Sequence, residues 1–132
     1  MTRESHDDRA SIQAVLEALY TARSDGDLDQ LTGLFAEDGH FRISGSGDGK
    51  PIAIMANGAG AIHGWLTVLL KSFSISRREM LVTVIEGPQA AVHWRATIHS
   101  RITGAQVVTE LMDHVEVSAG KIASYVEFFV PL

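Results

Sequence analysis

The sequence predicts an α+β domain in which a curved antiparallel sheet, shaped like a cone, wraps around three N-terminal helices. Two observations lead to this fold class. Apolar residues recur at helical spacing in the first half of the chain, whereas β-branched and aromatic segments separated by turn residues fill the second half. Because the chain has 132 residues, we expect residues 1–132 to form a single domain.

Three segments of the first half are predicted to be helical. Residues 8–23 carry apolar side chains three and four positions apart, and an aspartate at position 7 or 8 can cap the helix. Asp27 starts a short second helix that includes Phe35 and ends near residues 37–39. The third helix, over residues 62–73, has a continuous apolar stripe and is expected to lie on an apolar surface.

The remaining segments are predicted to be strands and turns. Residues 40–44 alternate as a short strand, the Gly/Ser-rich stretch 45–51 is expected to be a loop, and a further segment covers 52–55. Four β-rich segments joined by tight turns then form an antiparallel meander, over residues 76–86, 90–101, 106–118 and 121–130.

Composition excludes several classes of function. The net charge is -5 and the eleven basic residues are scattered, which disfavours nucleic acid as a partner. No apolar run is long enough to span a bilayer, so we expect no membrane partner and a cytoplasmic protein. The chain has no cysteine, and His93 and His99 are six residues apart with the other histidines on separate elements, so we expect neither a metal site nor a cofactor.

Strand pairing predicts which side chains face the helices. A two-residue turn at 104–105 would place Ala96 opposite Asp113, Trp94 opposite Val115 and Ile98 opposite Leu111. This face is apolar except for the carboxylate of Asp113. The outer face would then pair histidines with glutamates, namely His99 with Glu110 and His93 with Glu116.

The turn at 119–120 extends the same face to the last strand. With Gly120 in a left-handed bulge position, Asp113 shares its face with Tyr125, Glu127 and Phe129. A competing register, with Gly104 as a bulge glycine, would instead turn inward the row His93, Arg95, Thr97 and His99. Burial of such a basic row costs several kcal/mol per uncompensated charge, so the apolar face is the preferred prediction.

Four short motifs resemble the nuclear transport factor two-like superfamily, in particular its SnoaL-like and ketosteroid-isomerase-like branch. They are DGDLDQL at 25–31, LFAEDG at 34–39, GKI at 120–122 and EFF at 127–129. The resemblance implies a cone-shaped fold whose pocket opens between helices and sheet. It also implies a homodimer packed through the outer face of the sheet.

The resemblance carries over to individual positions only in part. Steroid isomerases place a general-base carboxylate where this chain has Ile43. Their second acid, which stays protonated in an apolar site, aligns with Asp113, and their helix-one tyrosine falls one position from Tyr20. The resemblance therefore does not imply steroid isomerisation of the usual kind.

Epoxide hydrolases of the limonene type give a second comparison. They use an arginine between two aspartates, one of them on the last strand, where this chain has Glu127. Arg95 would supply the arginine, but Thr97 stands at the second aspartate, and Val130 replaces an aspartate found near the end of many SnoaL-like sequences. Neither the steroid isomerase set nor the epoxide hydrolase set of catalytic residues is therefore complete in this chain.

We predict that Asp113 and Glu127 are the catalytic residues. An acid on an apolar strand face has a raised pKa, which suits acid/base catalysis, although Asp113 could instead be ion-paired to Arg95 or Arg23, or face water. The residues expected to contact the ligand are mostly aromatic or aliphatic: Tyr20, Phe41, Ile43, Met55, Trp65, Trp94, Tyr125 and Phe129.

The predicted function is acid/base catalysis on a small hydrophobic carbonyl or polyketide-like compound. An isomerase, cyclase, dehydratase or hydrolase, the last including an epoxide hydrolase, would fit, and each would work without a cofactor. The alternative is a non-catalytic module that binds an apolar ligand. A third interpretation, a protein-binding dimer resembling transport factors, requires the apolar cleft to be collapsed.

Overall fold

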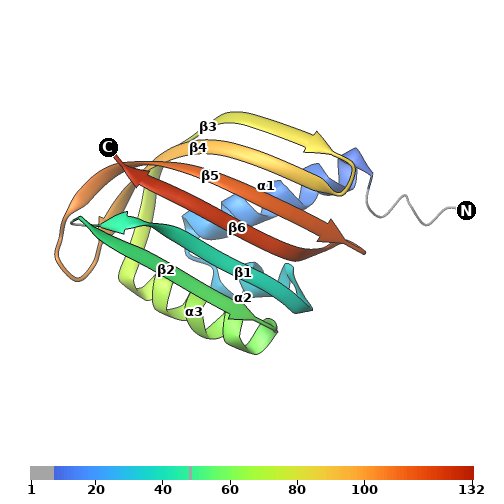
Figure 1. Cartoon of the computed structure of the whole chain (residues 1–132), viewed down its shortest axis with the longest axis horizontal. Helices are drawn as coiled ribbons and strands as arrows, with labels where there is room; N and C mark the ends of the chain where they lie inside the picture. The colour runs from blue at the N-terminus through green and yellow to red at the C-terminus, as the bar shows by residue number, and fades with distance from the viewer. Residues whose placement is uncertain (1–7, 48) are drawn as a thin grey trace, which may run out of the picture.

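The computed structural model describes residues 8–47 and 49–132, which form three helices and a six-stranded sheet (Figure 1). The helices are α1 (Arg9–Asp25), α2 (Leu28–Gly33) and α3 (Ala59–Ser72). The strands are β1 (Phe35–Gly47), β2 (Lys50–Asn57), β3 (Phe73–Glu86), β4 (Gln89–Ser100), β5 (Gln106–Ser118) and β6 (Lys121–Pro131). The helices lie against one face of the curved sheet, which confirms the predicted fold class.

The strand order is β2-β1-β6-β5-β4-β3. The predicted meander from β3 to β6 is antiparallel throughout, and β1 and β2 form an antiparallel hairpin. Strand β6 returns beside β1 and pairs with it in parallel. The sheet is therefore mixed. Helix α3 carries the chain from one edge strand, β2, to the other, β3, so the meander that follows ends beside β1 (Figure 1).

Local signals set the ends of α1 and α2. The Asp8 side chain accepts a hydrogen bond from the Ser11 N–H at 2.9 Å, and Gly26 closes α1 with a left-handed φ of 70°. The alternative cap at position 7 lies outside the described residues. Asp27 caps α2 as predicted, but that helix ends at Gly33. The inclusion of Phe35 in α2 is therefore wrong.

The reason is that the chain after α2 pairs with the sheet. The Leu34 carbonyl accepts a hydrogen bond from the Ile122 N–H at 2.8 Å, and Phe35 begins β1 opposite Ile122. The predicted loop at 45–51 is wrong for a related reason. Strand β1 continues to Gly47 and β2 starts at Lys50, so most of the Gly/Ser-rich stretch belongs to a hairpin.

Glycine is required at position 45 because this strand approaches β6 closely. A Cβ atom on Gly45 would lie 2.5 Å from the ring of Phe129, which is closer than carbon atoms pack. The same small residues that suggested a loop thus allow the edge hairpin to cover an aromatic side chain of the sheet.

The register between β4 and β5 differs from the prediction by four residues. Asp113 lies opposite Val92, and Trp94 lies opposite Leu111. The connection at 101–105 is longer than two residues, because the Ser100 N–H donates to the Ala105 carbonyl at 2.9 Å. A shift of an even number of residues leaves each side chain on its predicted face.

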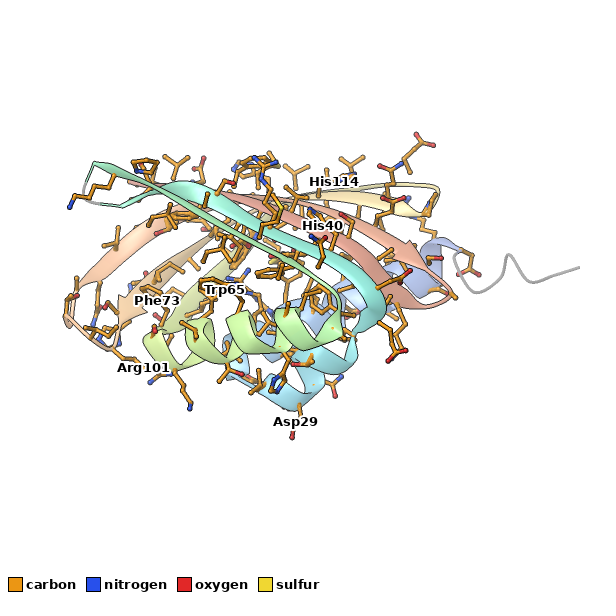
Figure 2. All side chains as sticks on the ribbon, turned by 60° about the horizontal axis from the view of Figure 1, so that its bottom comes forward. Asp29, His40, Trp65, Phe73, Arg101 and His114 are labelled. Atoms are coloured by element: carbon orange, nitrogen blue, oxygen red, sulfur yellow. The ribbon has the colours of Figure 1, made fainter. Side chains whose placement is uncertain are left out.

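The outer-face pairs of β4 and β5 change with the register. His99 lies opposite Gln106 and His93 lies opposite Met112, so the predicted pairs His99 with Glu110 and His93 with Glu116 are wrong. His93 instead contacts Glu110 diagonally, at 3.3 Å between Nε2 and Oε1. The competing register is also wrong, because Arg95 points outward between Glu79 and Glu110. His40 and His114 likewise stand on the face turned away from the helices (Figure 2).

The turn between β5 and β6 is tighter than predicted. Ser118 pairs with Lys121, and both turn residues, Ala119 and Gly120, have a positive φ, as in a two-residue hairpin turn. The irregularity lies earlier, between Glu116 and Val117. The predicted common face of β5 and β6 is confirmed, since Asp113 lies directly opposite Glu127.

Candidate functional site

A cluster of polar side chains is buried between α1 and the inner face of the sheet. We call it the acid cluster, and it consists of Tyr20, Arg23, Trp94, Asp113, Tyr125 and Glu127. Asp113 is 0 % exposed and Glu127 is 2 % exposed. Buried carboxyl groups are costly unless they are hydrogen-bonded or paired, so the contacts of these two residues determine what the site can do.

Four elements bring the acid cluster together, and β4 contributes Trp94. Helix α1 contributes Tyr20 and Arg23, which are three residues apart and therefore lie on one helix face. Asp113 and Glu127 face each other across β5 and β6, and Tyr125 shares the inward face of β6 with Glu127 because side chains alternate along a strand.

Three polar groups surround one oxygen of Asp113. Its Oδ2 atom lies 2.6 Å from the Tyr20 hydroxyl, 2.9 Å from the Trp94 Nε1 atom and 2.9 Å from the Tyr125 hydroxyl. Its Oδ1 atom is buried and has no hydrogen-bond partner among the residues that the structure describes. A buried oxygen without a donor is costly for an ionised carboxylate, whereas a protonated carboxyl can carry its proton there.

Tyr125 links the two carboxyl groups. Its hydroxyl is 2.9 Å from Asp113 Oδ2 but 2.5 Å from Glu127 Oε2. Because a tyrosine has one hydroxyl proton, it donates to one of these oxygens at a time, and the shorter distance favours Glu127. Arg23 donates to the Tyr125 oxygen at 2.7 Å and forms an ion pair with Glu127.

The pKa of Asp113 is raised well above its ordinary value. Burial is the largest cause, followed by the negative charge of Glu127 and hydrogen bonding with it, while Arg23 and the Tyr20 hydrogen bond act in the opposite direction. Asp113 is therefore the protonated member of the pair. Burial also raises the pKa of both tyrosines, which stay neutral donors.

The acid cluster as a whole is electrically neutral. Burial is the largest single influence on the pKa of Arg23 and lowers it, but Glu127, Tyr125 and Asp113 together outweigh burial and leave the pKa well above its ordinary value, so the guanidinium is charged. Arg23 then balances the carboxylate of Glu127, and Asp113 adds no charge. A neutral cluster can stay dry beneath an apolar cavity without an uncompensated buried ion.

An apolar cavity of about 620 Å³ lies beside the acid cluster. Its volume is in the range of small-molecule binding sites. The polar side chains at its inner end are Arg23, Tyr125 and Glu127. The other end reaches the β1–β2 hairpin and the β4–β5 connection, where Ser46, Ser100 and Thr103 line it. The interpretation that requires a collapsed cleft is therefore wrong.

The predicted ligand-contacting residues fall into three groups. Phe41, Ile43, Tyr125 and Phe129 line this cavity together with Glu127. Tyr20, Trp94 and Asp113 do not line it; they lie behind Tyr125 and Glu127, where Tyr20 packs edge-on against Trp94 at 5.2 Å between ring centroids. Asp113 is thus connected to the cavity through other residues.

Met55 and Trp65 lie away from the cavity, which corrects their predicted role. Met55 lies on β2, opposite Arg42 of β1, and is 60 % exposed, because alternation along the strand turns it to the outer face. Trp65 is 39 % exposed on α3, whose buried positions are Ile62 and Leu66 (Figure 2). The apolar stripe of this helix is broader than the face that it buries.

Arg23 is the functional candidate that sequence reasoning placed on the wrong partner. It was considered as a partner of Asp113, but it pairs with Glu127. Its position three residues after Tyr20 on the buried face of α1 is the signal that could have found it. Among the described residues, no group of three or more His, Cys, Asp or Glu side chains could hold a metal ion.

Comparison with known proteins places this geometry in context. The SnoaL-like domain family matches residues 16–125 of the chain. A search of curated protein sequences gave no match. Within residues 8–47 and 49–132, no helix has both the length and the apolar character needed to cross a bilayer.

Several solved structures have the same fold. A proposed isomerase from Bacillus subtilis is 17% identical, with a TM-score of 0.78 over 97% of this chain and 89% of that one. A nuclear transport factor two-like protein from Burkholderia xenovorans is 20% identical, with a TM-score of 0.76 over 93% and 92% of the two chains. An LEH-like epoxide hydrolase from M. tuberculosis is 13% identical, with a TM-score of 0.70 over 91% and 83%.

Proposed function

The chain belongs to the SnoaL-like domain family, and we propose that its cavity binds a small hydrophobic carbonyl compound with which Glu127 exchanges a proton. The observation that carries this proposal is the position of Glu127, a carboxylate that lines an apolar cavity of about 620 Å³ and is paired with Arg23 behind it. An ionised carboxylate in a dry site beside a ligand is suited to act as a general base.

The reaction follows from the arrangement at the inner end of the cavity. Glu127 removes a proton from a carbon next to the ligand carbonyl and returns it at another carbon, so that no atom is gained or lost. Negative charge that develops on the carbonyl oxygen would be stabilised by a donor, and the guanidinium of Arg23 is the charged donor at the inner end of the cavity. Isomerisation needs only this transfer. In an aldol-type ring closure the carbanion instead attacks a second carbonyl of the ligand, so that a carbon–carbon bond forms, the C=O π bond opens and Glu127 returns the proton to that oxygen.

Asp113 has a supporting role in this proposal. It does not line the cavity, and its Oδ2 is occupied by protein donors. As a neutral acid opposite Glu127, it adds no second negative charge there, and its Oδ2 contacts the Tyr125 hydroxyl that also contacts Glu127. Asp113 is therefore a positioning residue, and Glu127 is the catalytic residue that we propose.

A non-catalytic module that binds an apolar ligand is the second candidate. The observation in its favour is that Glu127 is already hydrogen-bonded to Tyr125 and ion-paired with Arg23. In a binding module these contacts would persist, and the ligand would be held by the apolar wall alone.

Turnover of a panel of small cyclic ketones, enones and epoxides separates the two candidates. We expect the wild-type protein to convert members of the panel, Glu127→Gln to bind them without conversion, and Asp113→Asn to retain part of the activity. Binding that is equal in wild type and Glu127→Gln, with no conversion by either, would contradict catalysis and support the binding module.

We also propose that two copies associate through the outer face of the sheet. Met112 and Phe128 lie opposite each other there, 47 % and 46 % exposed, and Arg42 stacks over the Phe128 ring at 5.5 Å. The same face carries Arg95 next to Glu110, so both signs of charge are available to a symmetric contact.

Sedimentation equilibrium tests this association. Phe128→Glu places a charge in the centre of the apolar pair and should convert the dimer to a monomer. Val68→Glu, at a residue of α3 that is 52 % exposed, is the matched control and should leave the dimer intact. A wild-type monomer at micromolar concentration would contradict the proposal.

A further inference from the structure

The open end of the apolar cavity is surrounded by three chain segments with the same composition. They are the start of β2, the junction of α3 and β3, and the β4–β5 connection. Ile52 and Phe73 line the cavity, as do Thr103 and Ala105, which follow Ile102 in the connection. Figure 1 places the β1–β2 hairpin and the β4–β5 connection at one end of the molecule. We call this end the cavity rim.

Each rim segment carries one basic and one exposed apolar side chain. The pairs are Lys50 with Ile52, Lys71 with Phe73, and Arg101 with Ile102. Ile52 is 38 % exposed, Phe73 is 40 % exposed and Ile102 is 79 % exposed. Single exposed apolar side chains are common on protein surfaces, but these three stand on segments that border one opening and can act together as an interaction site.

The basic side chains of the rim are available to a partner. Lys50, Lys71 and Arg101 are all exposed, and none of them forms an ion pair with another described residue. Figure 2 shows Phe73 and Arg101 at the same end of the molecule. This concentration of positive charge stands out because the whole chain has a net charge of -5.

We propose that the cavity rim docks on an anionic lipid surface, with Ile52, Phe73 and Ile102 inserted among the lipids and Lys50, Lys71 and Arg101 at the level of the headgroups. Basic residues near an anionic membrane are attracted to it, and apolar side chains add to the affinity when they reach the acyl boundary. The acidic remainder of the protein contributes little repulsion, because salt screens charges beyond about 10 Å.

A lipid surface fits the rim better than a protein partner does. A second copy placed rim to rim would bring like charges together, which opposes a symmetric contact. The apolar side chains stand on three separate segments around an opening, whereas a peptide helix or strand needs a continuous groove or a sheet edge. A lipid surface would instead place the cavity opening against the medium in which apolar molecules dissolve.

This inference revises the expectation of no membrane partner. That expectation rested on the absence of a bilayer-spanning segment, and surface docking requires none. The inference relies on the proposed function only for the apolar nature of the ligand. It can be tested with vesicles that contain no ligand, so its failure and the failure of Glu127 catalysis are distinguishable.

The test is co-sedimentation of the full chain with vesicles. One set contains phosphatidylcholine alone, and in the other phosphatidylserine makes up about a third of the lipid. We expect the wild-type protein to sediment with the anionic set and to be released by added salt. Arg101→Glu should weaken binding about tenfold or more, and Ile102→Ser should weaken it several-fold at low salt.

Two control variants make the same chemical changes away from the rim. Arg78→Glu reverses an exposed charge on β3, and Val84→Ser removes a side chain that is 55 % exposed on the same strand. Both should bind anionic vesicles as the wild type does. An absence of wild-type binding to anionic vesicles at low salt would overturn the inference and would favour a soluble acidic partner. Equal losses in rim and control variants would also overturn it.

Discussion

Replacement of Asp113 by asparagine should change how stability depends on pH. The asparagine amide keeps a carbonyl oxygen for Tyr20 and Trp94 and places its NH₂ group at the position of Oδ1, so it imitates the neutral, protonated acid. In the wild-type protein the pKa of Asp113 is raised above its unfolded value of about 3.9. Between these two pKa values, the folded state binds one proton that the unfolded state does not.

The sign and size of the effect follow from proton linkage. The free energy of unfolding changes with pH in proportion to the protons bound by the unfolded state minus those bound by the folded state. That difference is minus one in this window, so the wild-type protein loses about 1.4 kcal/mol per pH unit relative to Asp113→Asn as pH rises. The difference becomes constant once the pH exceeds the folded pKa.

Urea denaturation of both proteins at half-unit steps across this pH range measures the effect. Asp29→Asn, which removes an exposed carboxylate on α2, is the matched control and should follow the wild-type profile. A difference between wild type and Asp113→Asn that stays constant with pH would refute the protonated buried acid. If the free energy of unfolding of the wild-type protein instead rose with pH relative to that of Asp113→Asn, Asp113 would be an ion-paired carboxylate with a lowered pKa.

Three further substitutions test the packing of the site. Arg23→Met leaves the buried charge of Glu127 unpaired and should lower the free energy of unfolding by about 3–5 kcal/mol in urea denaturation. Gly45→Ala overfills the contact between β1 and β6 and should cost about 1–3 kcal/mol by the same measurement. Tyr20→Phe removes a donor that lowers the pKa of Asp113, so carboxyl-carbon NMR should show that pKa raised further.

The glycine prediction has an internal control. Gly33 is the last residue of α2, and a Cβ added there would meet nothing within 4 Å. Gly33→Ala should therefore leave the free energy of unfolding unchanged or raise it slightly. Equal destabilisation by Gly33→Ala and Gly45→Ala would contradict the close approach of Phe129. For Tyr20→Phe, an unchanged pKa of Asp113 would contradict the hydrogen bond between these residues.

Local patterns in the sequence predicted most elements but missed those that depend on distant contacts. Helix α1 follows from apolar spacing and its cap, and the strand faces follow from alternation. The end of α2 could not be predicted, because the Leu34 carbonyl is paired with Ile122 from the other end of the chain. The β1–β2 hairpin was missed because the need for glycine at position 45 arises from Phe129 on β6.

The sequence predicted both acids of the candidate site but not which of the two lines the cavity. Placing Asp113 and Glu127 on one face required only the short turn between β5 and β6. The register error between β4 and β5 was an even number of residues, so that face still points inward as predicted. Alternation does not reveal which of the two acids reaches the cavity, since that depends on how Tyr125 lies between them. The ion pair between Arg23 and Glu127 joins α1 to the last strand, so local patterns in the sequence could not predict it.

Proton exchange between a ligand and solvent is the most direct test of the proposed role of Glu127. The protein is incubated in D₂O with small cyclic ketones, and ¹H NMR follows the loss of the hydrogens next to the carbonyl. We predict that the wild-type protein accelerates this loss for at least one ketone that it binds, and that Glu127→Gln abolishes the acceleration while binding is retained. Exchange at the uncatalysed rate for every bound ketone, or equal acceleration by Glu127→Gln, would contradict that role.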